Sequence, residues 1–307
     1  MSALADAAAE YLQLRRSLGY KLADVARLLP RFVAYLDATG VSTVTVAAAL
    51  DWACQPPIID PTSTVWSRRM TAARGFALWL SAVDARTEVP PAGLISCPAH
   101  RAVPYLYSPD DVDTLLHAAR SLPSALRGAT YEALIGLLVV TGMRIGEAIG
   151  LDRRDLDGAN RVVVVRASKF NKSRELALHN SAHDALVDYA RRRDELCPHP
   201  KTTALLVSNA GTRLIYTNVC QVFAGLVRSA GVVPRPPARP RLHDFRHSFA
   251  VRTLRDWYAQ DVDVQARLPW LSTYLGHTCP ASTYWYLSAS PELLGLAARR
   301  LEARERP

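Results

Sequence analysis

The chain has 307 residues, of which 49% are hydrophobic, and it carries a formal net charge of +9. This length allows two domains with separate cores, and the apolar content argues against a disordered chain. The longest apolar run, residues 133–140, is too short to cross a bilayer, and the N-terminus lacks a basic segment followed by an apolar one, so we expect a soluble, cytoplasmic protein.

The positive charge favours a polyanionic partner, most simply nucleic acid. Lysine is rare among the basic residues: four of the 37 are lysine, and two of these, Lys169 and Lys172, lie three residues apart. The five cysteines are widely spaced, without a Cys-x-x-Cys pair, and therefore predict neither a zinc site nor a disulfide framework.

The first hundred residues carry apolar side chains at the three-to-four spacing of helices. Two such helices would bury Leu12, Leu14, Leu18, Val25, Leu28, Leu29, Phe32 and Leu36. A further helix is expected over about 64–82, with Arg68, Arg69 and Arg74 on its other face. That basic face is either a solvated surface or a set of phosphate contacts.

Prolines recur between residues 89 and 107, which is typical of a linker. Ser108, followed by Pro109 and two acidic residues, then indicates the start of a helix. We therefore place the domain boundary after residue 104, giving domains 1–104 and 105–307.

The second domain combines helices with one small antiparallel sheet, so the predicted fold class is mainly α. Strands are expected over 161–167 and 174–178, joined by a turn that holds both lysines. Helices are expected near 109–120, 128–140, 144–150, 181–196, 217–230 and 243–258, with shorter ones at 269–275 and 281–287 and a final helix over 292–305.

Six polar residues of this domain suit the cleavage of a phosphodiester by a side-chain nucleophile without a metal: Arg144, Lys169, His243, Arg246, His277 and Tyr286. Their local sequences are TGMRIGEAIGL over 141–151, HDFRHSFA over 243–250, and LGH over 275–277, nine residues before the tyrosine. Arginine suits this chemistry because its guanidinium stays charged and can bind two phosphate oxygens at once.

Some of these residues have a structural interpretation or a chemical requirement of their own. Arg144 could form a structural ion pair with Glu147, three residues further along. His243 and Arg246 have the spacing that places them on one side of a helix. A free tyrosine has a pKa of about 10, so a nucleophilic Tyr286 needs cations around its phenolate or a base such as His243. Tyr284, in the same helix, is expected to be a core aromatic.

These motifs, in this order and at these separations, closely resemble the catalytic domain of the tyrosine recombinases, also called phage-type integrases, over residues 105–307. The resemblance implies a mixed α/β catalytic domain that follows a SAM-like helical domain clamping DNA. Arg144 and Arg246 would then clamp the scissile phosphate and His277 would hydrogen-bond it. Lys169 would protonate the departing 5′ hydroxyl, and Tyr286 would be the nucleophile. No metal or other cofactor is implied.

The resemblance also implies partners. The protein would bind double-stranded DNA as a homo-tetramer on two duplexes, with or without sister recombinases. The final helix would dock into a neighbouring protomer or pack back onto its own domain. Further DNA contacts are expected from Arg68, Arg69, Arg74, Lys172 and Arg174.

Two stretches depart from the commonest pattern of the family. Residues 255–268 are longer than usual before LGH, and residues 280–287, PASTYWYL, are unlike the Xer type. The chain looks more like the recombinases of transposons and of elements with several recombinases in tandem. We therefore expect a site-specific recombinase of a mobile element, which cuts and rejoins DNA through a 3′-phosphotyrosyl link. The alternatives are a catalytically silent DNA-binding accessory protein of such an element and a type IB topoisomerase-like enzyme.

Overall fold

The computed structural model describes residues 2–55, 63–96, 102–166, 173–260, 262–277, 281–288 and 293–296, together with residues 279 and 298. The chain forms two compact units, Met1–Arg101 and Ala102–Pro307. We had expected the boundary after residue 104, which is three residues beyond Arg101.

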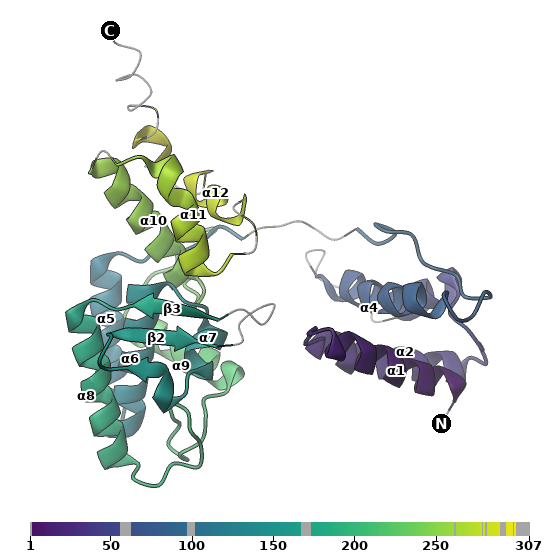
Figure 1. Ribbon diagram of the computed structural model, residues 1–307, viewed down its shortest axis with the longest axis horizontal. Helices are drawn as coiled ribbons and strands as arrows, with labels where there is room; N and C mark the ends of the chain where they lie inside the picture. The colour runs from purple at the N-terminus through teal and green to yellow at the C-terminus, as the bar shows by residue number, and fades with distance from the viewer. Residues whose placement is uncertain are drawn as a thin grey trace. The chain divides into compact units, whose positions relative to one another are not determined.

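The described part of the first unit consists of helices (Figure 1): α1 (Ala3–Ser17), α2 (Ala23–Ala38), α3 (Val46–Cys54) and α4 (Val65–Leu80). The Ser2 and Thr45 side chains cap α1 and α3 by accepting from the backbone N–H three residues further along. Phe32 and Trp52 meet in the core with ring centroids 4.8 Å apart. These helices therefore have an apolar core of their own.

The apolar face expected for the first helix was partly wrong. Leu14 and Leu18 are exposed, whereas α1 buries Leu4, Ala8, Tyr11 and Leu12. Leu14 follows the buried Leu12 by two residues, which turns it to the opposite side of a helix, and Leu18 lies at the C-cap.

The second unit begins with α5 (Pro109–Arg120), α6 (Ala125–Thr141), the short α7 (Ile145–Gly150) and the 3₁₀ turn η1 (Arg153–Asp155). After a small sheet it continues with α8 (Asn180–Leu196), α9 (Tyr216–Ser229), α10 (Asp244–Ala259), α11 (Val264–Leu275) and α12 (Ala281–Ser288). Ser108 caps α5 in a reciprocal capping box with Asp111, as its position before a proline predicted. In Figure 1, α5, α6 and α8 form one layer of this unit.

The sheet has three antiparallel strands in the order β1 (Leu156–Asp157), β2 (Val162–Val165) and β3 (Arg174–Ala177). Val163 lies opposite Leu176, and both side chains are fully buried. β1 was not predicted, because two residues are too few to show an alternating pattern. The fold class predicted from the sequence, mainly α with a small antiparallel sheet, is confirmed.

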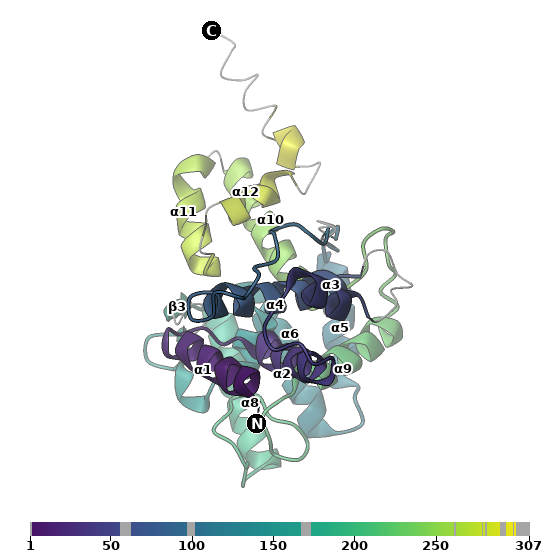
Figure 2. The ribbon, with the colours of Figure 1, turned by 90° about the vertical axis from the view of Figure 1, so that its right-hand side faces the viewer.

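α10, α11 and α12 gather around a second apolar cluster within this unit (Figure 2), which includes Ala250, Leu254, Leu271, Leu275 and Tyr286. This cluster positions the C-terminal end of α11 beside α10.

The helix α11 is longer than predicted. We expected it to start at Pro269, but it starts at Val264, where the Asp263 side chain accepts from the N–H of Ala266. Pro269 lies inside the helix and removes one backbone donor there, without ending the helix. Across the residues described, none of the helices combines the length and the apolar character needed to cross a bilayer.

Candidate active site

Three arginines from three different elements meet at the C-terminal end of α11. Arg174 on β3 donates from Nε to the carbonyl of Tyr274 at 2.8 Å. Arg246 on α10 donates from Nη2 to Leu275 O at 2.7 Å, and Arg144 donates from Nη2 to Gly276 O at 2.9 Å. The last carbonyls of a helix lack partners within it and lie at the negative end of its dipole. The helix end is therefore a suitable binding place for cations.

The sequence explains why α11 ends at this point. Gly276 adopts the left-handed conformation with φ of +68°, which glycine accepts without steric cost. A Cβ atom on this residue would also lie 2.9 Å from Nη1 of Arg174. Gly276 therefore both ends the helix and leaves room for the guanidinium.

Arg144 is the N-cap residue of α7. Its Nη1 donates to Oε1 of Glu147 at 2.9 Å, which is the ion pair considered from the sequence. Its backbone N–H also donates to Oε2 of the same carboxylate at 2.9 Å. Since 29% of the Arg144 side chain remains exposed, the guanidinium is held in place and still accessible to a ligand.

Arg246 lies in the first two turns of α10 and is almost fully buried. Besides Leu275 O, it donates from Nη1 to Gly142 O at 3.1 Å, and the nearby phenol group of Tyr286 acts to raise its pKa. Burial, together with the charge of Arg144, lowers its pKa to about 10, so the group stays protonated at neutral pH.

Tyr286 and Tyr284 differ sharply in exposure. Tyr286 is 2% exposed, and its ring lies 5.5 Å from that of His247 and 6.1 Å from that of His277, centroid to centroid. Tyr284 is 49% exposed, so the expectation that it is a core aromatic was wrong. The two residues are separated by two positions in α12 and therefore face opposite sides.

His243 is the N-cap residue of α10, and its ring lies 4.8 Å from the ring of His247. Desolvation of the imidazole, followed by the charges of Arg246, Arg144 and Arg241, lowers the pKa of His243 to about 4. The imidazole is therefore neutral at pH 7 and has a nitrogen that can accept a hydrogen bond or a proton.

His277 directly follows Gly276. Its backbone N–H donates to Ser272 O at 2.9 Å, and its Nδ1 lies 2.7 Å from Oγ1 of Thr283, which is fully buried on α12. Thr283 thereby fixes the orientation of the imidazole. Sequence reasoning missed this threonine, although its distance of three residues from Tyr286 on one short helix was a usable signal.

The structure thus brings together Arg144, His243, Arg246, His277 and Tyr286. Lys169 and Lys172 lie outside the described residues. Arg174 was expected to contact DNA, but its Nη1 and Nη2 donate to Oε1 and Oε2 of Glu147 at 3.1 and 2.8 Å. This guanidinium is committed to the protein itself, which argues against a phosphate contact.

The three arginines expected on α4 also have partners within the first unit. Arg68 pairs with Asp24 at 2.7 Å, Arg69 lies over the ring of Trp52 at 4.1 Å, and Arg74 donates to Pro90 O at 2.9 Å. Arg68 and Arg69 line a hollow of about 230 Å³ between α2 and α4, together with Arg27 and Arg31. The hollow therefore has a cationic wall.

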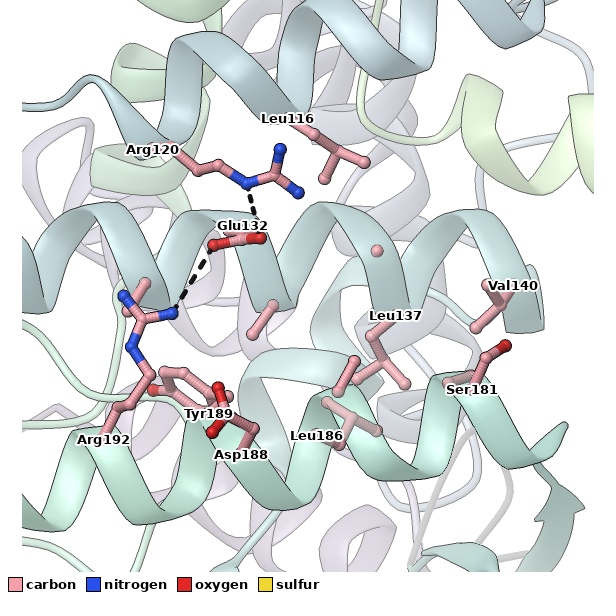
Figure 3. A pocket seen from close by; sticks show the side chains of 15 residues that line it. Leu116, Arg120, Glu132, Leu137, Val140, Ser181, Leu186, Asp188, Tyr189 and Arg192 are labelled. Atoms are coloured by element: carbon pink, nitrogen blue, oxygen red, sulfur yellow. Dashed lines mark hydrogen bonds and ion pairs between the residues drawn. The ribbon is translucent and has the colours of Figure 1, made fainter.

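A separate hollow of about 320 Å³ lies between α5, α6 and α8 (Figure 3). Its apolar floor includes Leu137 and Leu186, and at one end Glu132 pairs with both Arg120 and Arg192. Its lining includes none of the five predicted catalytic residues that the structure describes. Within the described ranges, no group of three or more His, Cys, Asp or Glu residues is arranged to hold a metal ion.

Comparison with known proteins agrees with this arrangement. Residues 106–292 match the model of the phage integrase family. The chain is 42% identical over 311 residues to y4rB of Sinorhizobium fredii, a protein named as an integrase/recombinase, with 99% of this chain and 98% of that protein covered. It is 38% identical to y4rE of the same organism, with 94% and 93% covered.

Solved structures share the fold. The Tn1549 transposon integrase in complex with transposon right end DNA matches with a TM-score of 0.64 and 17% identity, covering 96% of this chain and 99% of that one. The XerA recombinase matches with a TM-score of 0.52 and 21% identity, covering 99% of each chain. The matched family model covers more than half of the chain and includes Arg144, His243, Arg246, His277 and Tyr286. The protein therefore belongs to the phage integrase family of tyrosine recombinases.

Proposed function

We propose that the protein is a site-specific DNA recombinase that cleaves and rejoins DNA strands through a 3′-phosphotyrosyl intermediate. The observation that carries this proposal is the arrangement at the end of α11, where Arg246 binds Leu275 O, Arg144 binds Gly276 O, and the ring of Tyr286 lies 6.1 Å from that of His277. Tyr286 would then supply the nucleophilic hydroxyl, and the two guanidinium groups would bind the phosphate.

In the proposed reaction, the Tyr286 oxygen attacks the scissile phosphorus and forms the new P–O bond. The P–O bond to the 5′ oxygen breaks, and that oxygen takes a proton from Lys169. Arg144 and Arg246 stabilise the charge that develops on the non-bridging oxygens, which is usually the largest catalytic contribution. The ester bond is conserved in the phosphotyrosyl link, so the reverse attack by a 5′ hydroxyl needs neither ATP nor a metal.

The neutral imidazole of His243 would receive the phenolic proton as Tyr286 attacks. A phosphodiester anion between the arginines would offset the positive field that lowers the pKa of His243, and so would make the imidazole a better base. His277, oriented by Thr283, would donate a hydrogen bond to the phosphate.

We further propose that the first unit is a helical DNA clamp. Its contacts with the phosphate backbone would come from Arg68, Arg69 and Arg74, with Arg27 and Arg31 added by the structure, and Lys172 would contribute from the catalytic unit. Four protomers on two duplexes, linked through their C-terminal helices, would form the active assembly in the cytoplasm, alone or with sister recombinases.

A role in a mobile element is supported by the structural likeness to the Tn1549 transposon integrase and by the departures of residues 280–287 from the Xer pattern. The recombinase would then move that element rather than resolve chromosome dimers.

The test is covalent trapping on nicked duplexes taken from the DNA that flanks the gene, carried out in EDTA. The native protein should form a protease-sensitive adduct with DNA, Tyr286→Phe should form none, and Tyr284→Phe should react as the native protein does. An adduct that persists in Tyr286→Phe would exclude this nucleophile. Defined binding without an adduct in any protein, even with partner recombinases added, would favour an accessory role.

A further inference from the structure

We propose that Arg174 is a positioning residue of the active site, which keeps the charge of Arg144 available for the phosphate by compensating Glu147. This inference rests on the proposed function, since it concerns how the same site reaches its catalytic form. It assigns a role to a side chain that had been expected to contact DNA.

Arg174 is largely buried, and its guanidinium is bound by other groups of the protein. Its side chain is 12% exposed and makes three hydrogen bonds, one to Tyr274 O and one to each oxygen of Glu147. Two parallel bonds from one guanidinium to one carboxylate form the strongest and most directional arginine contact. Three of the five N–H donors of Arg174 are thus used inside the protein.

The carboxylate of Glu147 is nearly buried and accepts four hydrogen bonds, two from Arg174 and two from Arg144. Burial opposes ionisation, but these hydrogen bonds and the two guanidinium charges outweigh it and hold the pKa of Glu147 below its usual value. Glu147 is therefore an anion shared by two arginines.

The charges of Arg144, Glu147 and Arg174 do not cancel. Arg144 and Glu147 alone would have no net charge, and a neutral pair attracts a phosphate weakly. With Arg174 the group of three has a net charge of +1, and the exposed member is Arg144. Arg174 therefore supplies the positive charge that Glu147 would otherwise cancel, while Glu147 holds Arg144 by its backbone and its side chain.

Arg174 also connects this group to the rest of the site. It binds Tyr274 O, two residues before Gly276 and three before His277. The first residue of β3 is thus joined to α7 through Glu147 and to the end of α11 through Tyr274. A single side chain holds together the elements that carry Arg144 and His277.

The experiment compares Arg174→Met, Glu147→Gln and the double variant with the native protein in single-turnover cleavage at saturating protein, and measures the DNA dissociation constant over a range of salt. We expect Arg174→Met to lower the cleavage rate about 100-fold while the affinity changes less than about threefold. Because a neutral amide no longer cancels Arg144, the double variant should cleave about tenfold faster than Arg174→Met alone.

Arg120→Met is the matched control, since Arg120 pairs with Glu132 at 2.7 Å in the hollow between α5, α6 and α8, and it should cleave as the native protein does. Arg174→Lys keeps the charge but cannot make the two parallel hydrogen bonds to Glu147. Its cleavage rate should lie between those of the native protein and Arg174→Met. It replaces Arg174→Met in the comparison if thermal unfolding shows that the methionine variant does not fold.

Two results would overturn the inference alone, provided that the native protein forms its adduct. One is a loss of affinity, with a shallower salt dependence and an unchanged rate at saturation, which would make Arg174 a phosphate contact. The other is a double variant no faster than the single one, which would leave Arg174 a purely structural role. A native protein that binds DNA and forms no adduct would overturn the proposed function together with this inference.

Discussion

Arg246 on α10 donates to the carbonyl of Leu275 at the end of α11, with 2.7 Å between Nη2 and the oxygen. The same guanidinium also donates from Nη1 to Gly142 O at 3.1 Å. A planar fork with five donors can satisfy these acceptors together, whereas an ammonium group has three donors on one atom. The contact with Leu275 therefore fixes the orientation of the guanidinium relative to α11.

Substituting Arg246→Lys should keep the charge and lose this arrangement. We expect cleavage of a nicked duplex to slow by about 100-fold or more, because the clamp loses its two-point grip on the phosphate. Single-turnover trapping measures the effect. Arg252→Lys is the control, since Arg252 lies on the same helix and donates to Val139 O on the surface. If the two variants cleave at equal rates, Arg246 does not bind the phosphate in the proposed way.

Thr283→Val tests the orientation of His277. The substitution preserves shape and removes the hydroxyl that lies 2.7 Å from Nδ1 of the imidazole. We expect a loss of about tenfold in cleavage rate and about 1 kcal/mol in the free energy of unfolding, with DNA affinity unchanged. Thr273→Val on the exposed face of α11 should change neither quantity noticeably. A Thr283→Val protein as fast as the native one would show that His277 needs no such support.

Gly276→Ala should damage both stability and cleavage. The new Cβ would face a φ of +68° and an Arg174 nitrogen at 2.9 Å, so we expect a loss of about 1–3 kcal/mol in the free energy of unfolding. Gly225→Ala in α9 has open space around its Cβ and should raise stability by up to about 1 kcal/mol. Urea unfolding of both variants decides the matter, and equal effects would contradict the crowding at Gly276.

His243 should make stability depend on pH. Its pKa is about 4 in the folded protein and about 6.5 when unfolded. Between these values the unfolded chain binds more protons, so stability is fully present above pH 6.5 and is lost as the pH falls towards 4. The imidazole is only partly enclosed, because residue 243 keeps surface in contact with solvent that screens the guanidinium charges, so we expect a loss on the order of 1 kcal/mol.

The measurement is urea unfolding of the native protein and of His243→Asn at several pH values from 7 to 4. The difference in unfolding free energy between the two proteins should change through this window and be constant above it. A difference that is constant throughout would show that His243 titrates normally in the folded state.

The sequence predicted the helices with strong local signals and the order of the motifs. Ser108 and Gly276 mark a helix start and a helix end through local backbone chemistry, and both act as expected. The start of α11 was missed because a proline was given more weight than Asp263, which caps the helix. Local rules therefore located most helices and failed where two signals competed.

The candidate site was predicted less completely. Arg144, Arg246 and Tyr286 could be named from motifs, since each lies in a distinctive local sequence. The partners of Arg174 could not, because Glu147 and Tyr274 are 27 and 100 residues away from it in the chain. Nor did the sequence tell which of two neighbouring tyrosines is buried, since this depends on how α12 packs against α10 and α11.

The three arginines bind the carbonyls of Tyr274, Leu275 and Gly276. Their positions therefore depend on where α11 ends and not on where it begins. Residues added between Ala259 and Asp263 would lengthen the connection from α10 without shifting Tyr274, Leu275 or Gly276, whereas Val264 and Leu268 are buried in the apolar cluster. The long stretch over residues 255–268 is thus compatible with an unchanged site. The connection before Val264 can therefore change in length while the three arginines keep their places at the end of α11.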